Sequence, residues 1–131
     1  MDPTTGAVTF VAKGAEIASR ALALDGSIGG MTGGMISLSS SGGNNGLIWT
    51  LAPTNGNANT AVVAGALRVY DATTPAANPN GDGTPRMKLL WDSTNWNINF
   101  PFSKFCPPVV ADGKLFVATY GGTVDVYTLT P

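Results

Sequence analysis

The chain has 131 residues, a length that fits one ordinary domain, and its apolar fraction of 44% is sufficient for a folded core. Charged residues make up 11% and the net charge is −1, which argues against nucleic-acid binding and against a polybasic membrane anchor. The sequence has no histidine and one cysteine, which excludes imidazole chemistry, an internal disulfide and a CxxC metal site within one chain. We therefore expect no catalytic residue, no metal site and no cofactor.

The beginning of the sequence shows no targeting signal. Met1–Gly6 lacks a basic segment followed by an apolar stretch, so we expect no signal peptide in this chain. No apolar run approaches the roughly 20 residues that a membrane span needs.

Strand-like runs dominate the chain from its first residues. One strand is expected at 7–12, and only Ala15–Leu24 has the composition of a short helix, bracketed by Gly14 and Asp25-Gly26. Elsewhere short β-type runs alternate with turn dipeptides, which predicts an all-β fold of antiparallel strands.

Four strands are expected between residues 33 and 93, at 34–39, 47–51, 65–71 and 88–92. We place a turn at Asn45-Gly46 between the first two. Trp49 and Trp91 lie on the second and fourth of these strands, where we expect them to pack between layers rather than to bind a ligand.

Three more strands are expected between residues 107 and 129. Asp112-Gly113 suits a two-residue type I′ hairpin, because both positions need positive φ angles, and Gly121-Gly122 marks the next turn. In the final strand Val124 and Val126 alternate with polar residues, so we expect the two valines to face the core.

The two groups of strands carry an internal repeat. Gly65–Tyr70 and Gly122–Tyr127 share the pattern G-x-[LV]-x-V-Y, and Gly46–Trp49 matches Gly113–Phe116 in the preceding strand. Repeats built from four short strands predict blades of a β-propeller, and the alternative is a plain β-sandwich.

In the propeller interpretation, residues 1–131 are a single propeller segment of about two blades. The range 1–13 holds a lone fourth strand, 33–93 is a full blade of four antiparallel strands, and 103–131 supplies the first three strands of the last blade. The lone strand is the one that the last blade lacks.

The pattern Gly-x-Leu-x-Val-Tyr-Asp-Ala at 65–72, with a following strand that ends in Leu90-Trp91, resembles the repeats of quinoprotein-like (PQQ-repeat) propellers. The stretch Phe102–Tyr120 is similar to the C-terminal blade of such bacterial proteins. The resemblance covers roughly residues 33–130 and implies a propeller fold and an extracellular or periplasmic location. Members with dehydrogenase activity hold their quinone beside calcium and carry adjacent cysteines, whereas this sequence has no Cys-Cys pair and its single glutamate is Glu16.

Two blades cannot close a ring, so we expect completion by a longer parent chain or by self-association. Our first interpretation is a non-enzymatic propeller fragment that forms a closed homo-oligomer, preferably a trimer or tetramer. The strand at Val8–Val11 of one subunit would then complete the last blade of the next.

Two other functions stay open: a carbohydrate- or small-ligand-binding module, and a remnant of a PQQ-dependent oxidoreductase. The candidate ligand-binding residues are Trp96 and Lys104. Trp96 lies in the polar link between blades and has a role either in recognition or in packing. Lys104 would point toward the ring axis and suit an anion, and the alternative is a solvated lysine at the start of a strand. The Asn-rich segment 54–60 is either a third part of that site or a disordered surface loop. Apolar neighbours predict that Cys106 is buried and inert.

Overall fold

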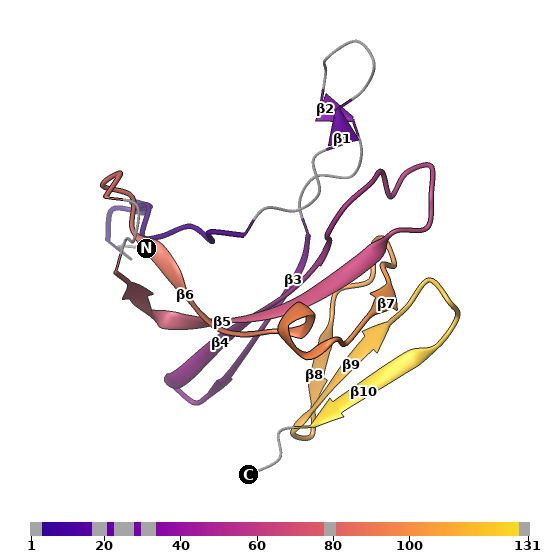
Figure 1. Cartoon of the computed structure of the whole chain (residues 1–131). Helices are drawn as coiled ribbons and strands as arrows, with labels where there is room; N and C mark the ends of the chain where they lie inside the picture. The colour runs from indigo at the N-terminus through magenta and orange to yellow at the C-terminus, as the bar shows by residue number, and fades with distance from the viewer. Residues whose placement is uncertain (1–3, 17–20, 23–27, 30–33, 78–80, 129–131) are drawn as a thin grey trace.

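A computed structural model of the chain describes residues 4–16, 21–22, 28–29, 34–77 and 81–128. These residues form antiparallel β-sheets and one short 3-10 helix, and no α-helix occurs among them, so the predicted all-β class is confirmed (Figure 1). A small hairpin of β1 (Ala21–Leu22) and β2 (Ile28–Gly29) projects from the main body. Ala21 and Leu22 are therefore in a strand and not in the short helix that Ala15–Leu24 favoured; 17–20 and 23–24 lie outside the described residues.

The first sheet is a meander of four consecutive antiparallel strands, which matches the four strands expected between residues 33 and 93. Its order is β3 (Met35–Ser41), β4 (Asn44–Pro53), β5 (Ala64–Ala76) and β6 (Arg86–Asp92). The 3-10 helix η1 (Ser93–Trp96) interrupts the edge, and β7 (Phe100–Pro101) then pairs with the start of β5. Between β6 and β7, the buried Ser93 Oγ of η1 accepts a hydrogen bond from the backbone N–H of Leu67 at 3.1 Å. The amide of Leu67 therefore keeps a partner where the edge strand is interrupted.

The first hairpin turns earlier than predicted. The turn lies at Gly42-Gly43 between the paired residues Ser41 and Asn44, and Asn45 takes a positive φ of 54° inside β4. The prediction of a turn at Asn45-Gly46 is therefore wrong: these two residues form a β-bulge, where two residues of β4 oppose one of β3. The extra residue sets the register, and because a slip of one residue reverses every side chain, it decides which face of the sheet Trp49 occupies.

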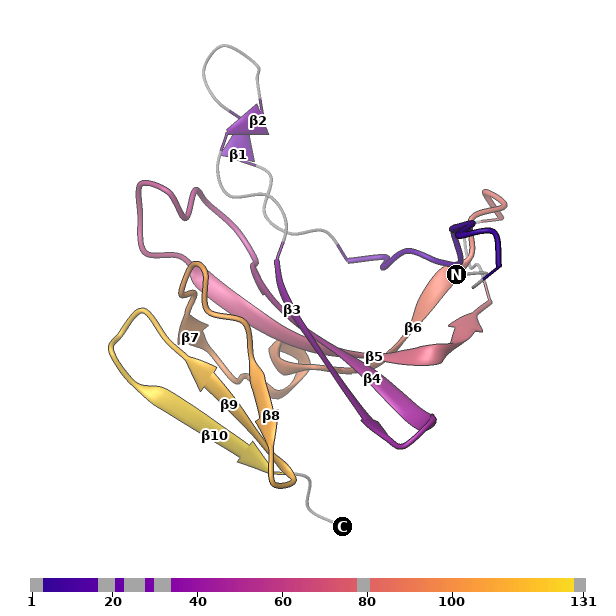
Figure 2. The same ribbon diagram turned by 180° about the vertical axis from the view of Figure 1, so that it is seen from behind.

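The second sheet is a three-stranded meander of β8 (Val109–Ala111), β9 (Lys114–Ala118) and β10 (Val124–Thr128), in the order β10-β9-β8. Asp112 and Gly113 have φ angles of 50° and 67° between the paired residues Ala111 and Lys114, so the predicted hairpin is confirmed. Gly122, at the second predicted turn, has a φ of 81° and donates its N–H to the carbonyl of Thr119 at 3.1 Å. Figure 2 shows this sheet from behind, beside the first.

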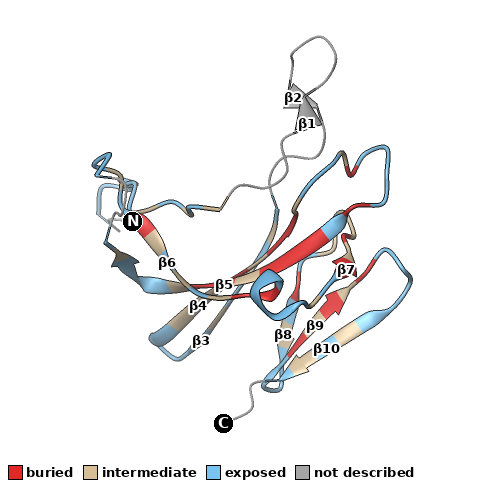
Figure 3. Cartoon of the chain, viewed as in Figure 1, coloured by how far each residue is buried: buried red, intermediate tan, exposed pale blue. Residues whose placement is uncertain are grey.

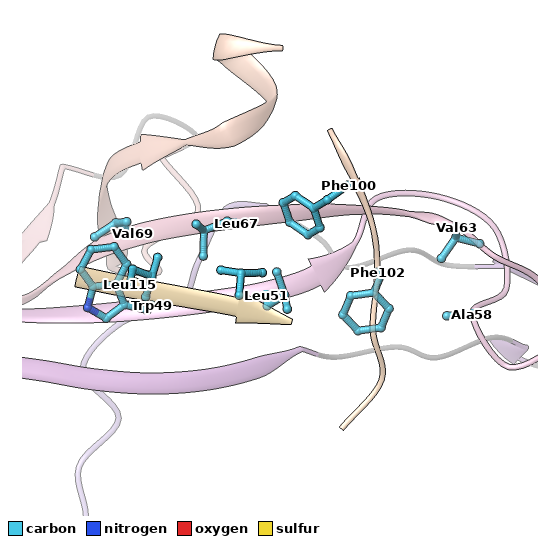
Figure 4. Close-up of a cluster of buried hydrophobic side chains, with 10 residues drawn as sticks. Trp49, Leu51, Ala58, Val63, Leu67, Val69, Phe100, Phe102 and Leu115 are labelled. Carbon is cyan, nitrogen blue, oxygen red and sulfur yellow. The ribbon is translucent and has the colours of Figure 1, made fainter. Parts of the chain in front are cut away.

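The core lies where the two sheets face each other, and the buried parts of β5, β7 and β9 adjoin it (Figure 3). Figure 4 shows Leu115 of β9 among side chains of the first sheet. The cluster comprises Trp49, Leu51, Ala58, Val63, Leu67, Val69, Phe100, Phe102, Leu115 and Val117. Trp49 also donates its indole N–H to Ser39 Oγ at 2.8 Å, and Trp91 packs partly buried against the cluster, so the packing roles predicted for both tryptophans are confirmed.

Each sheet has a second apolar face on the side away from this core. On the first sheet the exposed fractions of Ile36 and Leu38 are 61% and 70%. On the second sheet the exposed fractions are 56% for Val109, 61% for Val124 and 54% for Val126. The second sheet is therefore apolar on both sides, and the first sheet exposes aliphatic side chains of β3 on its outer side, which a finished two-layer domain does not need.

The alternation predicted for the last strand is present, but its direction is reversed. Asp125 pairs with Val117, which is fully buried in the core, so Asp125 shares the core side of the sheet. Val126 pairs with Phe116 and lies with Val124 on the outer face. The prediction that the two valines face the core of this chain is therefore wrong.

The N-terminal segment runs beside β6. Lys13 donates its backbone N–H to the carbonyl of Pro85 at 3.1 Å and accepts from the N–H of Met87 at 2.9 Å, an isolated parallel bridge. Residues 7–12, where a strand was expected, have no strand assignment, and Val8 and Phe10 are exposed. In the part of the chain that the structure describes, β10 pairs with β9 alone.

Candidate functional site

Three segments that are distant in sequence meet in a pocket of about 220 Å³ that contains the predicted residue Lys104. One side comes from the loop between β4 and β5, another from the chain after β7, and the third from the loop between β9 and β10. The lining residues are Ala58, Asn59, Thr60, Ala61, Val62, Phe102, Lys104 and Tyr120. The pocket thus brings together two of the three predicted parts of a ligand site, Lys104 and the Asn-rich segment.

The loop between β4 and β5 is a compact turn built around Asn57. The carbonyl of Asn57 accepts from the N–H of Ala61 at 3.0 Å, and its side-chain Oδ1 accepts from the N–H of Asn59 at 2.9 Å. Ala58 and Val63 are buried in the core cluster and hold the loop against the body. The segment is therefore positioned as one wall of the pocket.

The other walls are tied to the same loop through backbone hydrogen bonds. Phe102 is 3% exposed, and its N–H donates to the carbonyl of Val63 at 2.8 Å. Tyr120 donates its N–H to the carbonyl of Pro101 at 3.0 Å. The apolar ring of Phe102 thus forms a fixed floor of the pocket, while the Tyr120 side chain stays largely exposed at the rim of the pocket.

The charge in the pocket comes from Lys104 alone. No lining residue is acidic, and Lys104 forms no ion pair with any residue in the ranges that the structure describes. Asn59, Thr60 and Tyr120 add an amide and two hydroxyl groups, which can donate as well as accept hydrogen bonds, and the Thr60 hydroxyl already donates to the carbonyl of Asn57 at 3.5 Å.

The backbone that presents Lys104 has an unusual conformation. The next residue, Phe105, has a φ of 62°, a region that bulky residues rarely adopt, and its ring is exposed. Ser103 Oγ donates to Cys106 Sγ at 3.3 Å across this turn. Cys106 is a free thiol and half-buried, so the prediction that it is buried holds only in part.

Trp96 lies apart from this pocket. It ends η1 with 67% of its surface exposed, and it is not among the residues that line the pocket around Lys104. The structure therefore does not join the two predicted ligand-binding residues, Trp96 and Lys104, in one cavity.

A second, smaller cavity of about 130 Å³ lies between the N-terminal segment and the turn that joins β5 to β6; Val11, Ile48 and Asp71 are among its lining residues. Hydrogen bonds from Thr73 and Thr74 lower the pKa of Asp71 to about 2. All three bonds go to Oδ1 and fix the carboxylate to its own turn. This cavity offers a ligand no free positive charge.

Two polar contacts stabilise the outer side of the first sheet. Arg68 Nε donates to Asp92 Oδ2 at 2.6 Å, and the two side chains are 12% and 8% exposed. The hydroxyl of Tyr70 donates to Glu16 Oε2 at 2.6 Å, and burial together with this bond raises the pKa of Tyr70 well above its usual value. Glu16, the only glutamate, thus anchors the N-terminal segment over β5.

The Arg68–Asp92 pair makes stability depend on pH. Burial raises the pKa of Asp92, but hydrogen bonds from Thr94 and Arg68 outweigh it and hold the pKa below its usual value. The ionised carboxylate therefore stabilises the fold above pH about 4, the unfolded value, and that contribution is lost as the pH falls through the folded value. We expect Asp92→Asn to cost about 3 kcal/mol at pH 7 and less at pH 3, measured by urea unfolding at one protein concentration.

The control for this prediction is Asp112→Asn, which removes the exposed ion pair to Lys114 at 3.5 Å and should cost less than about 0.5 kcal/mol. An effect of Asp92→Asn that stays the same from pH 7 to pH 3 would contradict the assigned role of the carboxylate.

No family model matches the chain, and no curated protein or solved structure matches it either. None of the described residues belongs to a helix that is both long and apolar enough to cross a membrane. The same residues contain no group of three or more His, Cys, Asp or Glu side chains arranged to hold a metal ion.

Proposed function

We propose that this chain forms two consecutive blades of a β-propeller and closes the ring by association with further copies of itself. Its role is then structural and not enzymatic, and the ring is of the quinoprotein-like repeat type that Gly65–Tyr70 and Gly122–Tyr127 resemble. The proposal depends mainly on the direction in which equivalent residues of the two sheets face.

The repeated motifs lie on equivalent strands. Gly65–Tyr70 belongs to β5, the third strand of its meander, and Gly122–Tyr127 leads into β10, the third strand of the other. Leu67 and Val69 of the first copy point into the core between the sheets, toward the second sheet. Their equivalents, Val124 and Val126, point away from the first sheet and are exposed. Equivalent residues of the two sheets thus face in the same direction, from the first sheet toward the second and beyond it.

The second strands of the two meanders follow the same rule. Trp49 of β4 is in the core, whereas its equivalent Phe116 lies on the outer face beside Val126. Ile48 lies on the outer side of the first sheet, whereas its equivalent Leu115 is buried between the sheets. A sandwich whose halves face each other would bury equivalent residues of both sheets together, so this arrangement favours blades that repeat by rotation about an axis.

The first strands of both meanders also lie next to each other, since β3 contacts β8. Successive blades of a propeller place their first strands side by side around the axis. The remaining strands of each sheet then follow outward, as the orders β3-β4-β5-β6 and β8-β9-β10 allow.

A second copy of the chain is the partner that fits both outer faces. The face with Val124 and Val126 is equivalent to the one that already packs inside the chain, and the face with Ile36 and Leu38 belongs to the sheet that would receive it. Burying five such aliphatic side chains contributes about 10 kcal/mol, similar to the cost of bringing two proteins together. A closed ring has one more interface than it has association steps, so closure favours the complete ring over open chains.

The fourth strand of the incomplete sheet is assigned to residues 7–12. This segment has no strand partner in the described chain, and Val8, Phe10 and Val11 expose apolar side chains. Among the strands that the structure describes, β10 pairs with β9 alone, so the segment from an adjacent copy fits beside it.

Light scattering coupled to size exclusion tests the proposal. We expect a particle of three or four times the 13.4 kDa chain mass, which corresponds to six or eight blades. A stable monomer at micromolar concentration would refute self-association.

A further inference from the structure

The pocket around Lys104 has features of a binding site that are independent of ring assembly. It lies at the loop end of the two sheets, and none of its lining residues is Ile36, Leu38, Val109, Val124 or Val126, the residues of the outer faces. A ligand and a neighbouring copy therefore use different surfaces. We propose that this pocket binds a small organic anion through a carboxylate or phosphate group.

The charge of the ligand follows from the chemistry of the walls. Lys104 is half-buried, and no acidic residue lines the cavity. A lysine in this position lacks an internal counterion among the described residues, and an anionic oxygen would form a charge-assisted hydrogen bond with its ammonium group. Asn59 and Tyr120 line the other two walls, and each carries a group that is able to donate a further hydrogen bond to an anion.

The body of the ligand follows from the floor. Phe102 and Ala58 are almost fully buried and present an apolar surface, and the exposed ring of Tyr120 stands at the rim. A planar apolar group fits against such aromatic surfaces. The volume of about 220 Å³ is below that of pockets for drug-sized ligands, so the ligand is small.

The walls are preorganised, which reduces the entropy that binding would cost. The backbone bonds of Phe102 to Val63 and of Tyr120 to Pro101 tie three chain segments together, and the turn around Asn57 fixes the remaining wall. The left-handed conformation of Phe105 directly follows Lys104. Strained backbone of this kind persists where the surrounding structure enforces it, and it is concentrated at ligand sites.

Titration calorimetry of the assembled protein with benzoate and with phenyl phosphate tests the proposal, because the two probes separate carboxylate from phosphate recognition. We expect saturable binding of at least one of them with a Kd of about 1 mM or tighter, and binding of uncharged benzyl alcohol at least about tenfold weaker. Lys104→Gln should weaken binding of the anion by at least about tenfold, whereas Lys88→Gln on β6 should leave that binding unchanged.

The proposal is overturned if neither anion saturates at about 20 mM, if benzyl alcohol binds as well as the anions, or if Lys104→Gln binds as tightly as the unchanged chain. The solution mass of Lys104→Gln is measured in parallel and should equal that of the unchanged chain. A change in mass without a change in anion binding would also contradict a ligand role for Lys104, and it would leave the ring proposal to its own test.

Discussion

Replacing Val124 and Val126 together with aspartate should reduce the proposed ring to monomers while the fold is retained. The two valines are exposed in the isolated chain, so the exchange costs the monomer little, whereas at an interface it would bury two charges without partners. We expect association to weaken by at least about a thousandfold, equivalent to about 4 kcal/mol, measured as solution mass against concentration. Circular dichroism should still report the β-sheet spectrum.

Asn95→Asp with Asn99→Asp is the matched control, because it adds the same charge at exposed positions in the chain segment between β6 and β7. It should leave the mass of the assembly unchanged. Equal dissociation of both double variants would show that net charge, and not the outer face, controls association.

The double variant of Val124 and Val126 also tests the head-to-tail geometry when it is combined with a second double variant. Ile36→Asp with Leu38→Asp should abolish assembly as well, because each interface joins one face of either kind. A mixture of the two variants keeps one unaltered face on each partner, so no complex larger than a heterodimer should form. A trimer or a larger particle in the mixture would contradict head-to-tail packing.

Gly65→Ala should strongly destabilise the first sheet. Gly65 pairs with Phe100, and a Cβ at this position would collide with the Phe100 ring. That ring is 5% exposed within the core cluster and has no open space to move into. We expect a loss of about 3 kcal/mol in urea unfolding.

Gly43→Ala is the control, because nothing lies within 4 Å of the added carbon and the φ of Gly43 is not positive. Its effect should stay below about 0.5 kcal/mol. Phe100→Leu in the Gly65→Ala background should recover part of the loss by removing the clash. Equal stability of Gly65→Ala and Gly43→Ala would show that β5 and β7 separate easily.

The strands were largely predictable because their signals are local. Alternating apolar residues and the Asp112-Gly113 dipeptide each reflect a preference of a few neighbouring residues, and the structure follows them. The first turn was misplaced because Gly42 and Asn45 both adopt positive φ angles. Local preference allows the turn to form either at Gly42-Gly43 or at Asn45-Gly46. The strand register that takes Trp49 into the core selects Gly42-Gly43.

The direction of the last strand was not predictable from its own residues. Alternation separates Val124 and Val126 from Asp125, but it does not say which side meets the other sheet. An apolar pattern on that side is equally compatible with a core and with a surface that receives a partner. Only the packing of Leu115 and Val117 against the first sheet distinguishes the two.

The pocket was predictable in part. Lys104 and the Asn-rich segment stood out because each is polar in a place where the strands are interrupted. Phe102 and Tyr120 have no comparable signal, since their role depends on a meeting of three chain segments that only the fold creates. Trp96 is an aromatic residue in a polar link, a pattern that fits either packing or recognition, and the structure leaves it exposed and outside the cavity.

The two borders of the second sheet differ in how readily they accept another chain. β8 has only three residues and follows Pro107 and Pro108, which have no N–H to offer an incoming backbone. β10 is longer and carries no proline between Val124 and Thr128. The addition of a further strand to this sheet is therefore favoured at β10 over β8, which gives growth by strand addition a preferred direction.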